Sequence, residues 1–327
     1  MIPFALIRIK DNETAIQNGS AKGSKFIAGG TNLIDLMKLD IEKPQKLVDI
    51  NALDLHQITV LPNGHVRVGA LVKNTAFAYH PEIVKRFPVI SEAILSGASP
   101  QLRNMASTGG NILQRTRCYY FYDTSFACNK REPGSGCSAI NGYNRNHAIL
   151  GASESCIATH PSDLCVALTA LDAVVFTQGP KGKRSLLFSE FHRLPGTTPQ
   201  IENVLQPGEL ITAIEIPALN FASRSCYLKV RDRASYEFAL ASAAVALDIS
   251  NGKINQSRIA LGGVGTKPWR SKEAEKQLAG LVIGKEAFRK AADVALADAR
   301  PHMHNGFKTE LAKRTLVRAL MTASEIA

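Results

Sequence analysis

The sequence lacks the patterns that mark several common classes of protein. It has no apolar run of about 18 residues, the length at which a membrane-spanning helix is suspected. The start, MIPFALIRIKDNETAI, places charged side chains directly after a short apolar patch and offers no small-residue cleavage site. Its cysteines never form the C-x2-C pairs of zinc ribbons. We therefore expect a first strand at the start, with no signal peptide and no membrane span.

Positive charge is what the sequence has in excess. Its 39 lysines and arginines against 28 acidic residues give a formal net charge of +11, which would suit a nucleic acid, an acidic membrane or an acidic protein partner. The basic residues are dispersed, and glycine–aromatic RNA-reading motifs and zinc-finger spacings are missing. We therefore expect no nucleic acid, and we assign the charge to solvated faces or a subunit interface. At 327 residues and 45% hydrophobic, the chain is long enough for two or three folding units.

The first local motif is the segment SKFIAGGTNLIDLMK, residues 24–38. It predicts a short strand, a tight turn on Gly29 and Gly30, and a helix that begins at Thr31 or Asn32. Such a turn directs several backbone N–H groups into one concavity, which suits a phosphate or pyrophosphate. Because the segment matches neither G-x-G-x-x-G nor the P-loop, a strand–helix turn without a function stays an alternative.

Two further motifs follow. A second glycine pair, Gly109 and Gly110, lies in the run ASTGGNI, where small residues let a backbone approach a ligand closely. A tight internal turn is the alternative there. Further along, HPSDLCVALTAL predicts a helix capped by Ser162 or Asp163, and Asp163 could be a plain N-cap.

The remaining elements follow from hydrophobic periodicity and turn signals. The run at 239–249 is read as either a strand or an apolar helix. We place a domain boundary in the loop at 217–224. The other expected elements are strands at 46–50, 65–72, 209–216, 226–231 and 258–264, and helices at 76–97, 271–280, 285–299 and 307–324.

Four of the six cysteines lie between the second glycine pair and the S-D-L motif. They are Cys118, Cys128, Cys137 and Cys156, with the spacing C-x9-C-x8-C-x18-C. This spacing is unlike that of zinc ribbons or bacterial ferredoxins. Crowding favours metal ligation, yet an iron–sulfur cluster, a zinc site, disulfides and inert thiols all stay open on spacing alone.

Three other residues near this segment have simpler interpretations. Cys165 and Cys226 lie in apolar runs, and a free cysteine behaves as a small hydrophobe, so we expect both in the core. Cys165 is the less certain of the two, because it follows Cys156 by only nine residues. A single histidine such as His160 is more often a hydrogen-bonded structural residue than a metal ligand.

Taken together, FIAGGTNLIDLMK, ASTGGNI, HPSDL and LKVRDRASYEFALAS resemble the flavin subunit of the molybdenum hydroxylases, the family of xanthine dehydrogenase and carbon monoxide dehydrogenase. The resemblance covers essentially the whole chain. Most members have only a short loop between the glycine pair and the S-D-L element. Here a long insert divides them, and its run RTRCYYFYDTSFACNKREPGSGC resembles the flavin subunit of the bacterial three-subunit aldehyde oxidoreductases, which carries a [4Fe-4S] cluster in such an insert.

The resemblance implies an α+β fold in two domains. The first would be a two-part FAD-binding domain of mixed sheets with flanking helices at 1–218, divided into about 1–53 and 54–218. The iron–sulfur insert would occupy about 112–157 of it. A smaller α+β domain would follow at 222–327.

The resemblance also implies the roles of individual residues. Asp163 would bind the ribityl or ribose hydroxyls of FAD, and Lys229 would lie near the pyrimidine edge of the isoalloxazine, where positive charge stabilises an anionic reduced flavin. The four insert cysteines, Cys118, Cys128, Cys137 and Cys156, would ligate the cluster. The loops around the rest of FAD would be formed by Ile27, Ala28, Gly29, Gly30, Thr31, Asn32 and Leu33, and by Ser107, Thr108, Gly110 and Asn111.

The implied activity is divided among subunits. A large molybdopterin-binding partner would convert an aldehyde and water to a carboxylic acid, a small partner would pass the electrons through [2Fe-2S] clusters to FAD in this chain, and an external acceptor would take them. We expect no residue of this chain to touch the aldehyde, because it has no recognisable molybdopterin site and no C-x4-C-x2-C motif. A stand-alone FAD oxidoreductase and a zinc- or disulfide-stabilised binding module are the alternatives. The compartment would be the periplasm, by export with a signal-bearing small subunit, or the cytoplasm.

Overall fold

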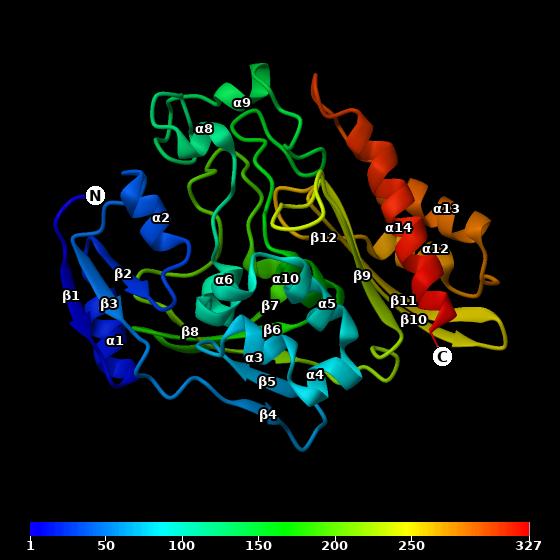
Figure 1. The fold of residues 1–327 in the computed structure, drawn as a ribbon, viewed down its shortest axis with the longest axis horizontal. Coiled ribbons are helices and arrows are strands. Elements are labelled where there is room, and N and C mark those ends of the chain that lie inside the picture. Colours follow the sequence, from blue (N-terminus) through cyan, green and yellow to red (C-terminus); the bar gives the residue numbers. More distant parts are fainter. Residues whose placement is uncertain (327) are drawn as a thin grey trace.

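The computed structural model describes residues 1–326, and its strands form three sheets that follow one another along the chain (Figure 1). The first sheet is parallel, with the strand order β1 (Ala5–Arg8), β3 (Lys46–Asp49), β2 (Ser24–Ile27). Helix α1 (Asn12–Gly19) connects β1 to β2, and helix α2 (Leu33–Lys38) follows β2. α1 begins where the Asp11 carboxylate accepts a hydrogen bond from the Thr14 amide at 2.8 Å.

The second sheet is antiparallel and forms the middle of the molecule. Its strand order is β4 (Ile58–Val60), β5 (Val66–Gly69), β8 (Leu210–Ile216), β6 (Val174–Gly179), β7 (Gly182–Leu187). The helices that pack on it include α3 (Asn74–Ala78), α4 (Pro81–Arg86), α5 (Pro88–Ser96) and α10 (Asp163–Ala170). Pro88 separates α4 from α5, because proline has no amide hydrogen to continue a helix but fits its first turn.

The third sheet lies near the carboxyl end. Its strand order is β12 (Trp269–Arg270), β11 (Lys253–Gly262), β10 (Ala241–Ser250), β9 (Ser225–Val230). β10 is a strand because both of its faces are covered. Ala243 and Val245 pack toward α14 (Phe307–Glu325), whereas Ala244 belongs to the core shared with α5 and α10. A strand buried on both faces shows no alternation of apolar and polar residues. Helices α12 (Lys272–Leu278) and α13 (Lys285–Ala295) complete this part.

A long irregular segment separates α7 (Thr108–Ile112) from α10, and we call its residues 113–161 the cysteine insert. It contains two short helices, α8 (Tyr119–Tyr122) and α9 (Ser138–Asn141), and lies at the top of Figure 1 between α2 and the carboxyl-terminal helices. Its base is closed, because the Thr116 hydroxyl donates to the Thr159 carbonyl at 2.9 Å. The insert therefore leaves and re-enters the fold at nearly the same place.

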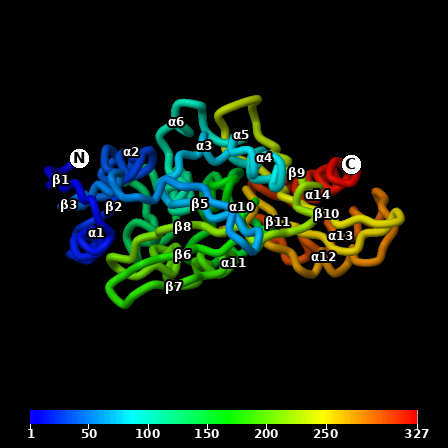
Figure 2. The backbone as a smooth tube through the Cα atoms, turned by 90° about the horizontal axis from the view of Figure 1, so that it is seen from below, coloured from blue at the N-terminus to red at the C-terminus, as the bar shows by residue number. Residues whose placement is uncertain are grey.

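The first and third sheets lie at opposite ends of the molecule, with the middle sheet between them (Figure 2). No helix within residues 1–326 has both the length and the apolar character required to cross a membrane. The α+β class expected from the sequence is confirmed. Helix α6 (Pro100–Met105) and α7 lie between the sheets and bring the second glycine pair close to the β2–α2 turn.

Candidate functional site

A cleft of about 800 Å³ runs between the first sheet, the middle helices and β9. Its lining includes every predicted cofactor residue except Thr108, and these residues come from four separate segments: Ile27, Ala28, Gly29, Gly30, Thr31, Asn32, Leu33, Ser107, Gly110, Asn111, Asp163 and Lys229. Thr108 does not line the cleft as we expected. It is fully buried, and its hydroxyl donates to the Val72 carbonyl at 2.9 Å, so its side chain holds α7 to the middle sheet.

At Gly29 the β2–α2 turn approaches the backbone of Met105 and Ala106, which directly precede the loop of the second glycine pair. A Cβ atom on Gly29 would lie 2.1 Å from the Met105 carbonyl oxygen, so only glycine fits between the two loops. Gly30 has φ +71°, a left-handed conformation that glycine adopts without strain. Asn32 occupies the N-cap position of α2, yet its side chain makes no cap hydrogen bond. It instead accepts one from the Arg115 amide of the cysteine insert at 2.9 Å.

The second loop is tied to the start of α10. The Ser107 hydroxyl caps α7 by accepting from the Gly110 amide at 3.2 Å. The Asn111 side-chain oxygen accepts from the Ser162 hydroxyl at 2.5 Å. Ser162 also caps α10 by accepting from the Cys165 amide at 3.2 Å. One serine thus fixes the two chain segments that flank the cysteine insert.

Asp163 and Lys229 form an ion pair at the wall of the cleft. The Lys229 ammonium donates to Asp163 Oδ2 at 2.8 Å and to the Ser96 carbonyl at 3.1 Å. The Tyr227 hydroxyl donates to Asp163 Oδ1 at 2.5 Å, and burial, followed by the negative charge of Asp163, raises the pKa of Tyr227 well above its usual range. Asp163 can still accept from a ligand hydroxyl, because a carboxylate has about four lone-pair sites. Sequence reasoning missed Tyr227, which lies in an apolar strand.

The insert brings the four predicted cysteines into one neighbourhood. Cys118 and Cys128 join Phe121 and Leu36 in a small apolar cluster, and the backbones of Cys128 and Cys137 pair with each other. All four are free thiols. Burial raises the pKa of Cys118 to about 12 and that of Cys156 to about 11, and the neighbouring cysteines add to both shifts. In the described chain no three of these sulfurs lie within 4.8 Å of one another.

His147 is a further residue of this neighbourhood, and no motif in the sequence predicted it. Its Nε2 atom lies 3.1 Å from the Cys118 sulfur. Burial, and then the positive charge of Lys308, lowers the pKa of His147 to about 4, so the ring is neutral at pH 7. The Lys308 ammonium donates to the His147 carbonyl at 2.9 Å, and the Asn305 side chain donates to it at 3.2 Å. Asn305, just before α14, and Lys308, in its first turn, therefore bind the insert through the His147 carbonyl.

His160, Cys165 and His192 form a second group whose ligand atoms lie within 4.8 Å of one another. The hydrogen bonds argue against a metal ion there. Ser162 N–H donates to His160 Nδ1 at 3.3 Å, which leaves the ring proton on His160 Nε2. His192 Nε2 donates to the Ile112 carbonyl at 2.9 Å, which leaves a lone pair on His192 Nδ1. His160 Nε2 and His192 Nδ1 are both buried without a hydrogen-bond partner in the described chain, and Cys165 is a core residue, as predicted.

We predict that His192 makes stability depend on pH. Burial lowers its pKa from 6.5 to about 4, while Glu202 and Lys267 exert smaller, opposing effects. The unfolded state then binds more protons between pH 6.5 and 4, so the stabilisation is complete above pH 6.5 and is lost as the pH falls through 4. The loss is up to about 3 kcal/mol, at about 1.4 kcal/mol per pKa unit.

Urea unfolding of the wild type and of His192→Gln at pH 4 to 7 measures this effect. Glutamine keeps an amide donor for the Ile112 carbonyl but does not titrate, so the variant should lose less stability on acidification than the wild type does. His147 titrates in both proteins and drops out of the difference, whereas His160, whose pKa is also lowered by His192, is measured together with it. Equal pH slopes in the two proteins would contradict the prediction.

Comparisons with known proteins agree with this geometry. The family model described as the FAD binding domain in molybdopterin dehydrogenase matches residues 3–219. The model of the CO dehydrogenase flavoprotein C-terminal domain matches residues 226–323. The chain is 51% identical, over 95% of both proteins, to the aldehyde oxidoreductase FAD-binding subunit PaoB of Escherichia coli. It is 28% identical to the glyceraldehyde dehydrogenase medium chain of Sulfolobus acidocaldarius, over 97% of this chain and 96% of that one.

Solved structures give the same result. A carbon monoxide dehydrogenase chain from Hydrogenophaga pseudoflava superimposes with a TM-score of 0.77 at 26% identity, over 99% of both chains. A reconstituted CO dehydrogenase from Oligotropha carboxidovorans gives a TM-score of 0.77 at 25% identity, over 100% of both chains. The predicted resemblance is thereby confirmed, and with it FAD as the cofactor of the first domain. The chain belongs to the FAD-binding medium subunits of the molybdenum hydroxylases, the oxidoreductase family of xanthine dehydrogenase and carbon monoxide dehydrogenase.

Proposed function

We propose that this chain is the electron-transfer flavin subunit of a heterotrimeric aldehyde oxidoreductase and that its cysteine insert holds a [4Fe-4S] cluster. The observation that carries the proposal is the position of α2. Its amino end lines the large cleft, and its Leu36 packs against Cys128 of the insert. Two redox groups would then lie on either side of one short helix. The 51% identity to an aldehyde oxidoreductase subunit supports an aldehyde as the substrate of the complex.

FAD would lie along the cleft, and bound FAD can take up electrons one at a time and release them singly or in pairs. The backbone from Ile27 to Leu33 and the Ser107–Asn111 loop would hold its pyrophosphate. Asp163 would accept a hydrogen bond from a sugar hydroxyl. The nearly buried Lys229 would supply positive charge near the isoalloxazine ring of FAD. Its hydrogen bond to the Ser96 carbonyl fixes the direction of the Lys229 side chain.

The four insert thiols are free and lie in one neighbourhood, where they could serve as the thiolate ligands of an iron–sulfur cluster. Backbone amides also point toward the thiols. Ala158 N–H donates to Cys156 at 3.5 Å, and further amides approach Cys118 and Cys137. Hydrogen bonds to sulfur stabilise thiolate ligands and tune the reduction potential of a cluster.

The aldehyde would be oxidised on a large molybdopterin-binding partner, and a small partner's [2Fe-2S] clusters would deliver the electrons to this chain. No residue of this subunit would then contact the aldehyde. The acceptor that removes the electrons would approach the open cleft. A small partner that bears an export signal would bring the complex to the periplasm, and without one it would stay in the cytoplasm.

The protein purified without oxygen from its producing cell tests this function. We expect flavin absorbance that bleaches on reduction, about four irons per chain beyond those of the partners, and two co-purifying subunits. A free monomer that turns over a small substrate would favour a stand-alone FAD oxidoreductase. Zinc without iron would favour a stabilised binding module, and a protein with neither flavin nor iron would contradict the proposal outright.

A further inference from the structure

Helix α2 is held mainly by the cysteine insert. Its buried side chain Leu36 lies in the apolar cluster formed by Phe121 and Cys128, with Cys118 and Tyr122 packed at its edge. α2 directly follows the Gly29–Gly30 turn, so its position sets the shape of that side of the cleft. Gln114, Arg115 and Arg117 of the insert also line the cleft, so a change in the insert reaches the cleft both directly and through α2.

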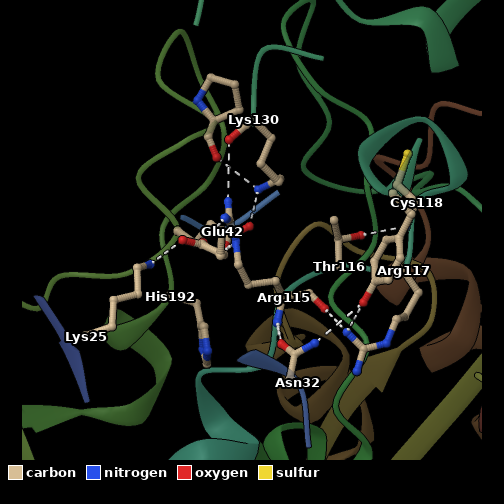
Figure 3. Close-up of polar contacts among 12 residues, drawn as sticks. Lys25, Asn32, Glu42, Arg115, Thr116, Arg117, Cys118, Lys130 and His192 are labelled. Carbon is tan, nitrogen blue, oxygen red and sulfur yellow. Dashed lines mark hydrogen bonds and ion pairs between the residues drawn. The ribbon is translucent and has the colours of Figure 1, made fainter. Parts of the chain in front are cut away.

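Arg115, the third residue of the insert, contacts both ends of this helix (Figure 3). Its backbone amide donates to the Asn32 side chain at the start of α2 at 2.9 Å. Its guanidinium donates to Glu42, four residues beyond the end of α2, at 2.6 Å. The same guanidinium lies over the Phe121 ring, 4.7 Å from its centroid. One residue thus fixes the helix at its two ends and joins it to the insert.

The ion pairs around Arg115 form an open chain of five charged side chains, of which Lys25 is exposed. Arg115 Nε donates to Glu202 at 3.0 Å, and Lys130 of the insert pairs with the same carboxylate at 2.8 Å. Lys25 of β2 pairs with Glu42 at 2.8 Å. Burial alone would raise the pKa of Glu202, but the charges of Lys130 and Arg115 outweigh it and lower that pKa. Each carboxylate also has a lysine partner, so removing the Arg115 guanidinium would leave the Lys25–Glu42 and Lys130–Glu202 pairs in place but break the connection between them.

We propose that Arg115 is a positioning residue that couples the affinity for FAD to the state of the insert cysteines. An ordered insert places Arg115 so that it holds Asn32 and Glu42 and keeps the β2–α2 turn in its FAD-binding shape. A disordered insert releases both ends of α2 and weakens FAD binding. The inference rests on the proposed function, since it takes FAD to bind in the cleft and a cluster to order the insert.

The variant Arg115→Met tests the coupling in the protein purified with its cluster. Methionine keeps the apolar stem and the backbone amide but removes the guanidinium. The FAD dissociation constant, measured by flavin fluorescence, should rise about tenfold while the iron content stays near that of the wild type. Arg115→Lys keeps the charge but not the bidentate geometry, so its FAD dissociation constant should lie between those of the wild type and Arg115→Met.

Arg270→Met is the matched control. Arg270 is also a buried arginine between two carboxylates, Asp172 and Glu275, but it lies far from α2 in the third sheet. Both variants should lower the unfolding temperature, and only Arg115→Met should weaken FAD binding.

Removing the cluster should raise the FAD dissociation constant of the wild type about tenfold and change that of Arg115→Met by less than twofold.

An unchanged FAD dissociation constant in Arg115→Met would overturn the coupling. So would a result in which removing the guanidinium and removing the cluster raise the dissociation constant by factors that simply multiply. Failure of the proposed function would look different, because the wild type itself would then lack flavin or iron. A wild type that contains both and an Arg115→Met variant that binds FAD normally would reject this inference alone.

Discussion

Serine in place of Cys128 should remove most of the iron of the proposed [4Fe-4S] cluster from the purified protein. A serine hydroxyl is a much weaker ligand for iron than a thiolate, and Cys128 is buried beside Leu36 and Phe121. Ligand loss unfolds the site that the metal orders. We expect iron and acid-labile sulfide to fall below about a quarter of the wild-type content. The same holds for Cys118→Ser, Cys137→Ser and Cys156→Ser.

Cys226→Ser is the matched control for this experiment. Cys226 is as buried as Cys128, since both side chains are 7% exposed, but it lies in β9 away from the insert. Its replacement should cost some stability and leave the iron in place. Cys165→Ala should also retain the iron. An equal iron loss on changing Cys165 or Cys226 would show that the ligand set is wrong.

Alanine at Gly29 should abolish tight flavin binding. The added Cβ atom would lie 2.1 Å from the Met105 carbonyl oxygen and 2.8 Å from the Met105 carbonyl carbon, and neither backbone atom can rotate away. The two loops must separate, and overpacking of this kind costs about 1–3 kcal/mol. We expect the FAD dissociation constant to rise about 10- to 100-fold, measured as flavin retained on gel filtration and by fluorescence titration.

Gly284→Ala supplies the comparison for Gly29→Ala. Gly284 precedes α13, and a Cβ atom there would meet nothing within 4 Å. That variant should keep its flavin and its unfolding temperature. The iron content of both variants shows whether the insert has stayed ordered. Normal flavin binding by Gly29→Ala would mean that the two loops do not approach each other as described.

Local signals predicted much of this fold. The β2–α2 turn and the start of α10 carry glycines, Ser162 and Asp163 at short range, and the structure places them close to where the sequence indicated. The apolar run at 239–249 was ambiguous because a strand covered on both faces has lost its alternation. Helix α1 was missed because its short polar sequence is weakly periodic and its start depends on the Asp11 cap.

The parts of the site that the sequence did not predict depend on contacts between distant segments. Tyr227 looks like any aromatic residue of a strand until β9 brings it to Asp163. Arg115 is in the sequence one of four basic residues that flank the insert cysteines, and its positioning role follows only from its contacts with Asn32 and Glu42. Thr108 was assigned to the cofactor by the family resemblance, but its hydroxyl donates to the Val72 carbonyl.

The closed base of the cysteine insert bears on how such a protein can evolve. The chain leaves at Thr116 and returns at Thr159, with one hydrogen bond of 2.9 Å between them. A segment whose ends meet joins its host at one junction. This insert nevertheless packs on its neighbours beyond that junction, because Ile149 and Leu150 belong to the core of the third sheet and Phe121 and Cys128 pack against Leu36 of α2. Arg115 lies at the junction, where an acquired segment would first become integrated with its host.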